Sequence, residues 1–175
     1  MIYYSDEHLL IRNIQPSDAA IITEEEIKQG WVNQTIDKYE LRLRDQAAGI
    51  SINLVAEWDG NVAGYINVYP NATGGAFGNQ GLPEIVDFGV LAKYRCNGIG
   101  SKLMDIAEEV ASGYSDTVYL GVGLYESYGA AQRMYVKRGY IPDGSGIWYG
   151  NTHCEPGNSY LLDDDLALYF SKKLR

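Results

Sequence analysis

The feature that most restricts the fold of this chain is an apolar segment that leads through a glycine-containing turn into an amphipathic segment. Residues 85–91 (IVDFGVL) are typical of a strand buried on both faces. The turn RCNGIG follows at residues 95–100, and apolar residues then recur at helical spacing over residues 98–112. Because the chain must reverse within this turn, Gly98 and Gly100 are expected to remove Cβ atoms that would crowd it. The pattern predicts a strand–turn–helix unit of an α/β fold.

The same turn has the chemistry of an anion site. Without side chains at Gly98 and Gly100, several backbone N–H groups can point into one concavity at the positive end of a helix dipole. Arg95 adds a formal charge at the mouth of this concavity. The spacing Arg-x-x-Gly-x-Gly is neither the dinucleotide fingerprint nor a P-loop. We interpret the turn as a diphosphate site; the alternative is a tight turn whose glycines serve packing alone.

The rest of the sequence alternates between strand and helix patterns. Strands are expected at residues 9–14, 52–58, 62–69, 117–122, 147–149 and 166–174. Helices are expected at residues 17–29, 35–48 and 128–138. Ser17 or Asp18 is expected to cap the start of the first, and Gly49 and Gly139 are expected to cap the ends of the other two. Asp59-Gly60 indicates a hairpin, and residues 70–81 are expected to form a loop. This order predicts a mixed sheet with flanking helices, and no repeat or linker interrupts it, so we expect one domain over residues 1–175.

The composition is that of a globular protein, since 46% of the residues are hydrophobic and 21% are charged. The formal net charge of -9 argues against nucleic acid as a partner and favours a cationic small molecule or a basic peptide end. The alternative is that the acidic surface only keeps the protein dispersed in solution. We expect no signal peptide, no membrane-spanning segment and a cytoplasmic location. Cys96 and Cys154 do not indicate a disulfide framework. His153-Cys154-Glu155 lacks the spacing of a metal site, so no metal is expected.

The segment from Val90 to Gly100 resembles the acetyl-CoA signature of the GNAT superfamily of N-acetyltransferases, in which a strand ending in Val precedes Arg/Gln-x-x-Gly-x-Gly/Ala. It differs at Ala92, where Pro is usual, and at Cys96, where Gly or Arg is common. Residues 128–142 (YGAAQRMYVKRGYIP) are similar to the second signature of the family. The resemblance covers nearly the whole chain. It implies a single GNAT-like α/β domain, with a mixed, mostly antiparallel sheet, helices on both faces and a splayed central pair of parallel strands.

The resemblance also implies a function, the transfer of acetyl from acetyl-CoA to a primary amine by direct attack. The acidic charge favours a cationic small molecule such as an aminoglycoside, a polyamine or an amino acid. A protein N-terminus or lysine is the alternative acceptor, and a homodimer is left open. Asp163-Asp164-Asp165 is expected to be a solvated turn, or a contact for such an acceptor if it borders the cleft. The rival interpretations are a non-catalytic acyl-CoA-binding sensor and a nucleotide-binding α/β protein.

By the same resemblance, the strand before the turn binds the pantetheine arm through its backbone, and the turn binds the diphosphate. The residues implied in cofactor binding are Phe88, Gly89, Val90, Arg95, Cys96, Asn97, Gly98, Ile99, Gly100 and Ser101. Gly89 supports a distorted strand, because glycine inside a strand often marks a bulge or a close backbone approach; ordinary pairing is the alternative. Tyr128 departs from the family pattern, since many relatives have Asn there.

Two residues are candidates for proton transfer. Tyr135 matches the family tyrosine that protonates the leaving thiolate, and a phenol with a pKa of about 10 suits this role, although a buried core tyrosine is the alternative. Glu84 lies where some members carry their general base; a solvated carboxylate or a water chain is the alternative. Other members place the base on the following strand, where this chain has Gly123. Asp87 is expected on the opposite face from Glu84 if the strand is regular, so only one of them can serve.

Overall fold

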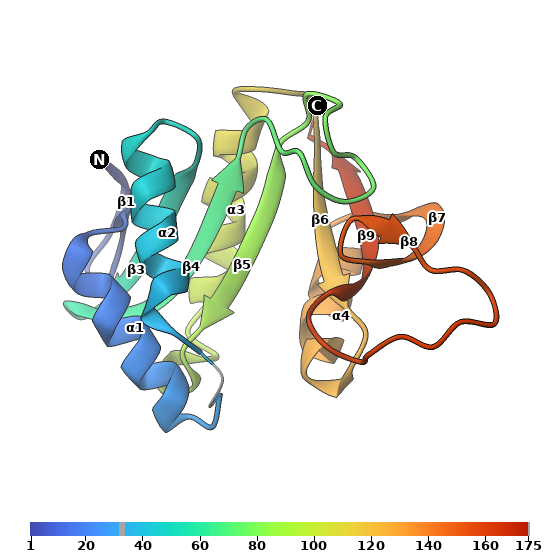
Figure 1. The fold of residues 1–175 in the computed structure, drawn as a ribbon. Helices are drawn as coiled ribbons and strands as arrows, with labels where there is room; N and C mark the ends of the chain where they lie inside the picture. The colour runs from blue at the N-terminus through green and yellow to red at the C-terminus, as the bar shows by residue number, and fades with distance from the viewer. Residues whose placement is uncertain (32–33, 175) are drawn as a thin grey trace. The chain divides into compact units, whose positions relative to one another are not determined.

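The predicted strand–turn–helix unit is present in the computed structural model, which describes residues 1–31 and 34–174. Strand β5 leads through a short 3-10 helix, η1, into helix α3 (Figure 1). These elements are β5 (Glu84–Val90), η1 (Ala92–Tyr94) and α3 (Ile99–Ser112). The chain forms two compact units. The first unit contains Met1–Tyr69 and Val86–Val110, and the second contains Pro70–Ile85 and Ala111–Arg175.

The first unit holds the N-terminal strands and most of β5. Its further strands are β1 (Ile2–Ser5), β2 (Leu9–Asn13), β3 (Ile52–Trp58) and β4 (Asn61–Tyr69). Neighbours pair antiparallel in the order β1-β2-β3-β4, and β5 lies next to β4. In the turn between β3 and β4, Asp59 has a φ of 49° and Gly60 a φ of 76°. Two left-handed residues are what a tight type I′ hairpin requires, so the hairpin prediction is confirmed.

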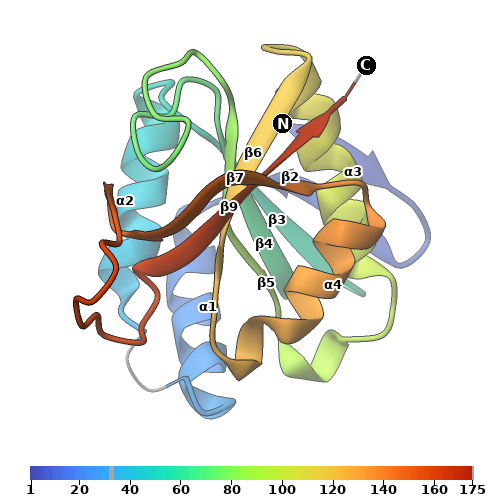
Figure 2. The ribbon, with the colours of Figure 1, turned by 90° about the vertical axis from the view of Figure 1, so that its right-hand side faces the viewer.

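Helices cover both faces of these strands. Helices α1 (Pro16–Lys28) and α2 (Ile36–Ala47) lie on one face, and α3 lies on the other (Figure 1, Figure 2). The core between α1, α2 and the strands consists of Ile14, Ala19, Ile22, Tyr39, Val55, Val62 and Tyr65. Full burial of an apolar side chain of this size stabilises the fold by roughly 1.5–3 kcal/mol. Gly49 follows α2 with a φ of 71°, as predicted for its C-terminal cap.

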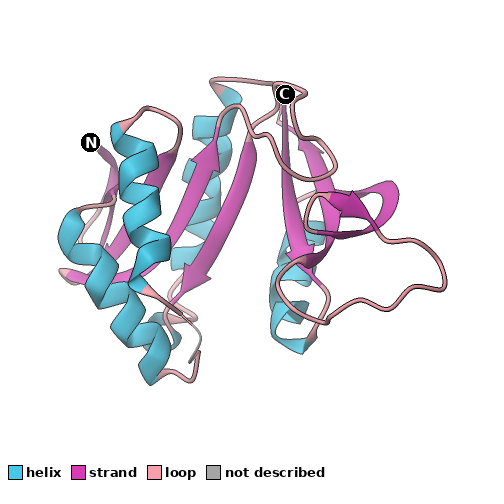
Figure 3. Ribbon diagram, in the orientation of Figure 1, coloured by secondary structure: helices cyan, strands magenta, loops and turns pink. Residues whose placement is uncertain are grey.

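The second unit consists mainly of strands and loops, with one α-helix (Figure 3). Its elements are β6 (Thr117–Gly123), η2 (Glu126–Tyr128), α4 (Gly129–Lys137), β7 (Ile141–Tyr149), β8 (Thr152–His153) and β9 (Leu166–Lys173). The C-terminal strand β9 lies between β6 and β7, and the antiparallel order is β6-β9-β7-β8. Strand β5 begins in this unit, where Glu84 pairs with Tyr119 of β6 in parallel register.

The predicted fold class is confirmed: the protein is an α/β fold with a mostly antiparallel sheet, one parallel strand pair and flanking helices. The extent of a single domain over residues 1–175 stays a prediction. Within residues 1–31 and 34–174, no helix is long and apolar enough to cross a membrane.

Three strands differ from the sequence expectation. Strands β1 and β8 are absent from it, because at 4 and 2 residues they are too short to show an alternating pattern. Strand β7 is longer than expected and begins at Ile141. Gly144 and Gly146 in its middle have φ values of 83° and 86°, and the register with β9 shifts between Pro142 and Ile147. This bulged glycine segment interrupts the strand signal.

Strand β5 is less buried than its apolar sequence suggests. Only Ile85 and Gly89 are buried, while the other residues of the strand are half-buried. The expectation of a strand buried on both faces is therefore wrong. An apolar run gives a preference for burial, but packing against each face decides how much of it is covered.

Candidate active site

The turn between β5 and α3 has the backbone geometry of an anion cradle. Cys96 and Gly98 both take left-handed conformations, with φ values of 65° and 78°. The Arg95 guanidinium donates through Nε to the Val90 carbonyl at 3.1 Å, which ties the turn to the end of β5. The first helical bond of α3 runs from Lys102 N to Gly98 O at 3.1 Å. The preceding N–H groups of the helix therefore lack an intrahelical acceptor and are available to an anion.

The two glycines of the turn serve different purposes. A Cβ on Gly100 would lie 3.1 Å from Phe88 Cζ and 3.3 Å from Val90 Cγ2, so this glycine lets α3 pack closely on β5. A Cβ on Gly98 would meet nothing within 4 Å. The expectation that both glycines relieve crowding holds for Gly100 and is wrong for Gly98, whose role is its positive φ.

Strand β5 is irregular at Asp87, which has a φ of 50°. A left-handed conformation costs a non-glycine residue about 1–2 kcal/mol, and Asp is among the residues that tolerate it. At Gly89 the backbone of β5 lies unusually close to residues of β4. A Cβ there would lie 2.7 Å from the Tyr65 hydroxyl, and a Cβ on Gly64 would lie 2.8 Å from the Gly89 carbonyl oxygen. Because the strand is irregular, the alternation argument that separated Glu84 from Asp87 does not apply.

The Asp87 carboxylate is held from α2 and β4. Arg42 contacts its Oδ2 through Nε at 2.7 Å and through Nη2 at 2.5 Å. Lys38 Nζ lies 3.5 Å from Oδ1, and Asn67 Nδ2 donates to Oδ2 at 3.3 Å. No sequence pattern pointed to this cluster, because its members come from three separate elements. A charged side chain inside an otherwise apolar strand was the one available signal.

Glu84 contacts Tyr119 in the second unit. The Tyr119 hydroxyl lies 2.9 Å from the Gly74 carbonyl oxygen and 3.3 Å from Glu84 Oε2. Burial, reinforced by the negative charge of Glu84, raises the pKa of the Tyr119 phenol. The phenol therefore keeps its proton at neutral pH and can donate it to either acceptor. Glu84 is half-buried and has a defined partner, which differs from the alternative of a solvated strand-end carboxylate.

Tyr135 lies on the inner face of α4 with 6% of its surface exposed. Its ring packs edge-to-face against Tyr140 at 5.8 Å between centroids. Burial raises the pKa of the Tyr135 phenol, so the group is protonated at neutral pH. Gly139 follows the helix with a φ of 89°, as expected for its cap.

Tyr128 closes the space at the end of β6. A Cβ on Gly123 would lie 2.5 Å from the Tyr128 ring, so only glycine fits beneath this side chain. The Tyr128 hydroxyl donates to Asp164 Oδ1 at 2.7 Å, and the Tyr125 hydroxyl donates to the same oxygen. Tyr149 donates to Asp163 at 3.0 Å. Asp164 and Asp165 are exposed, as expected of a solvated turn, and tyrosine hydroxyls additionally bind the carboxylates of Asp163 and Asp164.

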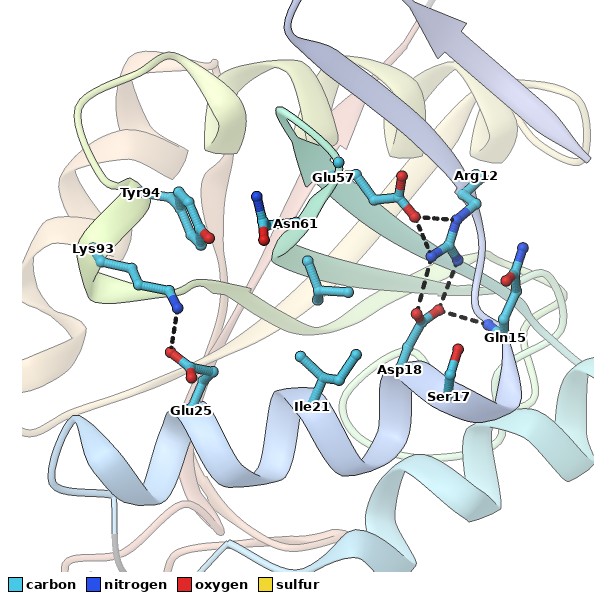
Figure 4. Close-up of a pocket in the computed structure, with 12 residues that line it drawn as sticks. Arg12, Gln15, Ser17, Asp18, Ile21, Glu25, Glu57, Asn61, Lys93 and Tyr94 are labelled. Atoms are coloured by element: carbon cyan, nitrogen blue, oxygen red, sulfur yellow. Dashed lines mark hydrogen bonds and ion pairs between the residues drawn. The ribbon is translucent and has the colours of Figure 1, made fainter.

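A polar pocket of about 380 Å³ lies beside the N-terminal half of α1 (Figure 4). Arg12 lies between Asp18 and Glu57 and contacts Asp18 through two nitrogens at 2.7 and 2.9 Å. Asp18 also accepts from Gln15 N at 2.7 Å, which confirms its predicted capping role. Because Arg12 pairs with both acids, we interpret this network as a link between β2, β3 and α1. Within residues 1–31 and 34–174, no group of three or more potential ligands is arranged to hold a metal ion.

The candidate site residues fall in both units. Phe88, Gly89 and Val90 lie in the first unit with the turn at residues 95–101. Glu84 and Tyr135 lie in the second unit, Glu84 beside Tyr119 and Tyr135 beside Tyr140.

Solved structures of acetyltransferases share this fold. An N-acetyltransferase from Staphylococcus aureus Mu50 is 22% identical, with a TM-score of 0.69 over 97% of this chain and 100% of that chain. YncA from Salmonella typhimurium, solved with acetyl-CoA, is 19% identical, with a TM-score of 0.66 over 97% and 95%. Arabidopsis thaliana Naa50, solved with the bisubstrate analogue CoA-Ac-MVNAL, is 19% identical, with a TM-score of 0.62 over 95% and 99%. No match was found among curated proteins.

The family is shown by the sequence itself. Residues 19–140 match the model of the acetyltransferase (GNAT) family. This range runs from α1 to Tyr140 and includes β5, the anion cradle, α3 and Tyr135. The chain therefore belongs to the GNAT family of acetyltransferases.

Proposed function

We propose that this protein is an N-acetyltransferase that moves the acetyl group of acetyl-CoA to a primary amine of a cationic small molecule. The observation that carries the proposal is the anion cradle. Cys96 and Gly98 take left-handed conformations just before α3, where the first backbone N–H groups of the helix lack intrahelical acceptors. These donors suit the diphosphate of coenzyme A. Acetyl-CoA as the donor is supported by the YncA structure, which contains it.

The cofactor would lie along β5 and the turn. In this proposal, the backbone of Phe88, Gly89 and Val90 binds the pantetheine arm, and one of these N–H groups faces the thioester oxygen. Residues 95–101 bind the diphosphate. The close packing of Gly100 on Phe88 and Val90 supports this assignment, because it places the turn directly against the strand. Bound acetyl-CoA supplies the activated thioester.

Glu84 and Tyr135 handle the protons in this proposal. Glu84 takes a proton from the substrate ammonium, directly or through water, so that the nitrogen can attack the carbonyl carbon. The C–N bond forms, the C–S bond breaks, and Tyr135 gives its proton to the leaving sulfur. The nitrogen then loses a second proton, which returns to Tyr135 through solvent. The Tyr135 phenol is protonated at neutral pH and so has a proton to give; its raised pKa makes it a weaker acid than free tyrosine.

The acceptor is tested by turnover of acetyl-CoA on a panel of amines. We expect free CoA to accumulate with at least one polyamine or aminoglycoside, because a net charge of -9 attracts cationic molecules. Formation of the acetylated product is followed by mass spectrometry. Turnover on peptide N-termini or lysines alone would assign the alternative acceptor class, to which the peptide-like analogue bound by Naa50 belongs. Tight binding of acetyl-CoA without turnover on any amine would indicate a sensor.

Cys96 offers a direct test of the cradle. It is an exposed free thiol within the turn, and Cys154, a free thiol of intermediate exposure, serves as an internal control. We expect saturating acetyl-CoA to slow alkylation of Cys96 by iodoacetamide about tenfold or more, because the bound diphosphate covers the turn. Alkylation of Cys154 should be unchanged. Peptide mass spectrometry measures both rates in one sample, and equal rates at Cys96 with and without acetyl-CoA would contradict the assignment.

A further inference from the structure

We propose that Asp87 is a positioning residue, whose carboxylate is held by Arg42 and thereby fixes the backbone of residues 88–90 for acetyl-CoA. The inference rests on the proposed function, in which these three residues bind the pantetheine arm. Asp87 directly precedes them in β5 and has a φ of 50°. A left-handed residue rotates the following peptide group out of the regular strand pattern. The direction of the N–H groups after Asp87 therefore depends on this one torsion.

The left-handed conformation is one that the surrounding structure must hold. A non-glycine residue in this region persists only when its neighbours over-determine it. Asp87 satisfies that condition, because Arg42 places two nitrogens on Oδ2 at 2.7 and 2.5 Å. Lys38 approaches the other oxygen at 3.5 Å, and Asn67 adds a third donor at 3.3 Å. The Asp87 carboxylate is therefore bound by two residues of α2 and one residue of β4.

Arg42 is itself fixed in place. Its Nη1 donates to the Tyr69 hydroxyl at 2.5 Å, and its guanidinium lies 5.2 Å from the centre of the Tyr69 ring. Nη1 also lies 3.7 Å from Asp45 Oδ2. The side chains of Arg42, Asp45 and Asp87 are 18%, 18% and 20% exposed, so solvent screens these charges only partly. A planar guanidinium held in this way provides a stiff support rather than a mobile counter-charge.

The strand is held again two residues later. Gly89 lies beneath Tyr65, whose hydroxyl would be 2.7 Å from a Cβ at that position. Tyr65 in turn donates to Glu26, which is fully buried in α1 and also accepts from Tyr39 at 2.5 Å. Residues on both sides of Phe88 are thus constrained by the layer that contains α1 and α2. The alternative is that the Arg42–Asp87 pair joins α2 to the sheet and has no effect on the cofactor.

Substitutions at Asp87 separate the two accounts. Asp87→Asn keeps an acceptor for Arg42 and tolerates a positive φ, so we expect the Kd for acetyl-CoA to rise no more than about threefold. Asp87→Ala removes the contacts with Arg42 and disfavours a positive φ, so we expect the Kd for acetyl-CoA to rise about tenfold or more. Asp87→Gly permits the positive φ but lacks the contacts with Arg42, so its Kd for acetyl-CoA should lie between those of the other two variants. Isothermal titration calorimetry measures Kd, and the same order is expected for KM of acetyl-CoA, with kcat within about threefold of wild type.

Glu57→Ala is the matched control. It breaks the Arg12–Glu57 ion pair, which joins β2 to β3 in the same unit and involves neither α2 nor β5. We expect it to lower Tm as Asp87→Ala does while leaving the Kd for acetyl-CoA within about twofold. If Asp87→Ala lowers Tm but binds acetyl-CoA as wild type does, the pair is only structural. If that variant fails to fold, Arg42→Lys decides: an unchanged Kd overturns the proposal, and a rise of about threefold or more supports it.

Failure of this inference and failure of the proposed function give different results. Wild-type binding of acetyl-CoA without turnover on any amine would remove the catalytic proposal, while loss of binding in Asp87→Ala would still support the positioning role. If wild type turns over and Asp87→Ala has an unchanged KM for acetyl-CoA, the catalytic proposal stands and the positioning role of Asp87 is overturned.

Discussion

Replacing Gly98 with aspartate is expected to weaken acetyl-CoA binding about 100-fold or more, because a carboxylate would compete with the diphosphate for the same N–H donors. A Cβ at position 98 meets no protein atom within 4 Å, so we expect the effect of the substitution to fall on the ligand and on the backbone. The φ of 78° adds strain for any residue with a Cβ. Isothermal titration calorimetry with acetyl-CoA measures the change.

Gly49 provides a control with the same chemistry at another place. Its φ is 71°, and a Cβ there would also meet nothing within 4 Å. Gly49→Asp therefore introduces the same strain and the same charge at the end of α2, away from the turn. We expect it to lower Tm by an amount similar to that of Gly98→Asp and to leave the Kd within about twofold of wild type. Equal loss of affinity in both variants would show that the effect comes from net charge or folding, and the cradle assignment would fail.

Removing the Tyr135 hydroxyl is expected to lower kcat about 100-fold while the Kd for acetyl-CoA stays within about twofold, since general acid catalysis contributes about 10² to 10⁴ in rate. The phenol is buried, and Tyr135→Phe preserves the ring that packs against Tyr140. Single-turnover measurements of acetyl transfer report the chemical step, and calorimetry reports binding.

A control variant, Tyr39→Phe, and the pH dependence of kcat distinguish an acid role of Tyr135 from a structural one. Tyr39→Phe also removes a buried hydroxyl, one that donates to Glu26 at 2.5 Å, and it should lower Tm without an effect of this size on kcat. The pH profile gives the second comparison. Because burial raises the pKa of Tyr135 above its ordinary value of about 10, the acid form persists, and kcat should not fall from ionisation of this group between pH ~7 and ~9.5. A loss of cofactor affinity equal to the loss of kcat would remove Tyr135 from the acid role.

The sequence predicted the elements whose signals are local. The Asp-Gly hairpin, the glycine caps after α2 and α4 and the strand–turn–helix unit each depend on a few neighbouring residues, and the structure contains all of them. The different roles of the two glycines, close packing at Gly100 and a positive φ at Gly98, were not predictable, because they depend on where Phe88 and Val90 pack. The Asp87 cluster was missed for the same reason. Its partners Arg42 and Asn67 are 45 and 20 residues away, and no single-sequence pattern joins them.

The packing of Tyr128 over Gly123 limits how this enzyme can be re-engineered. A Cβ at position 123 would lie 2.5 Å from the aromatic ring, so a catalytic base cannot be introduced there by a single substitution. Gly123→Glu alone would have to displace Tyr128 and break its hydrogen bond to Asp164. Positions 123 and 128 therefore have to change together: a base at position 123 fits only if Tyr128 is replaced by a small residue at the same time.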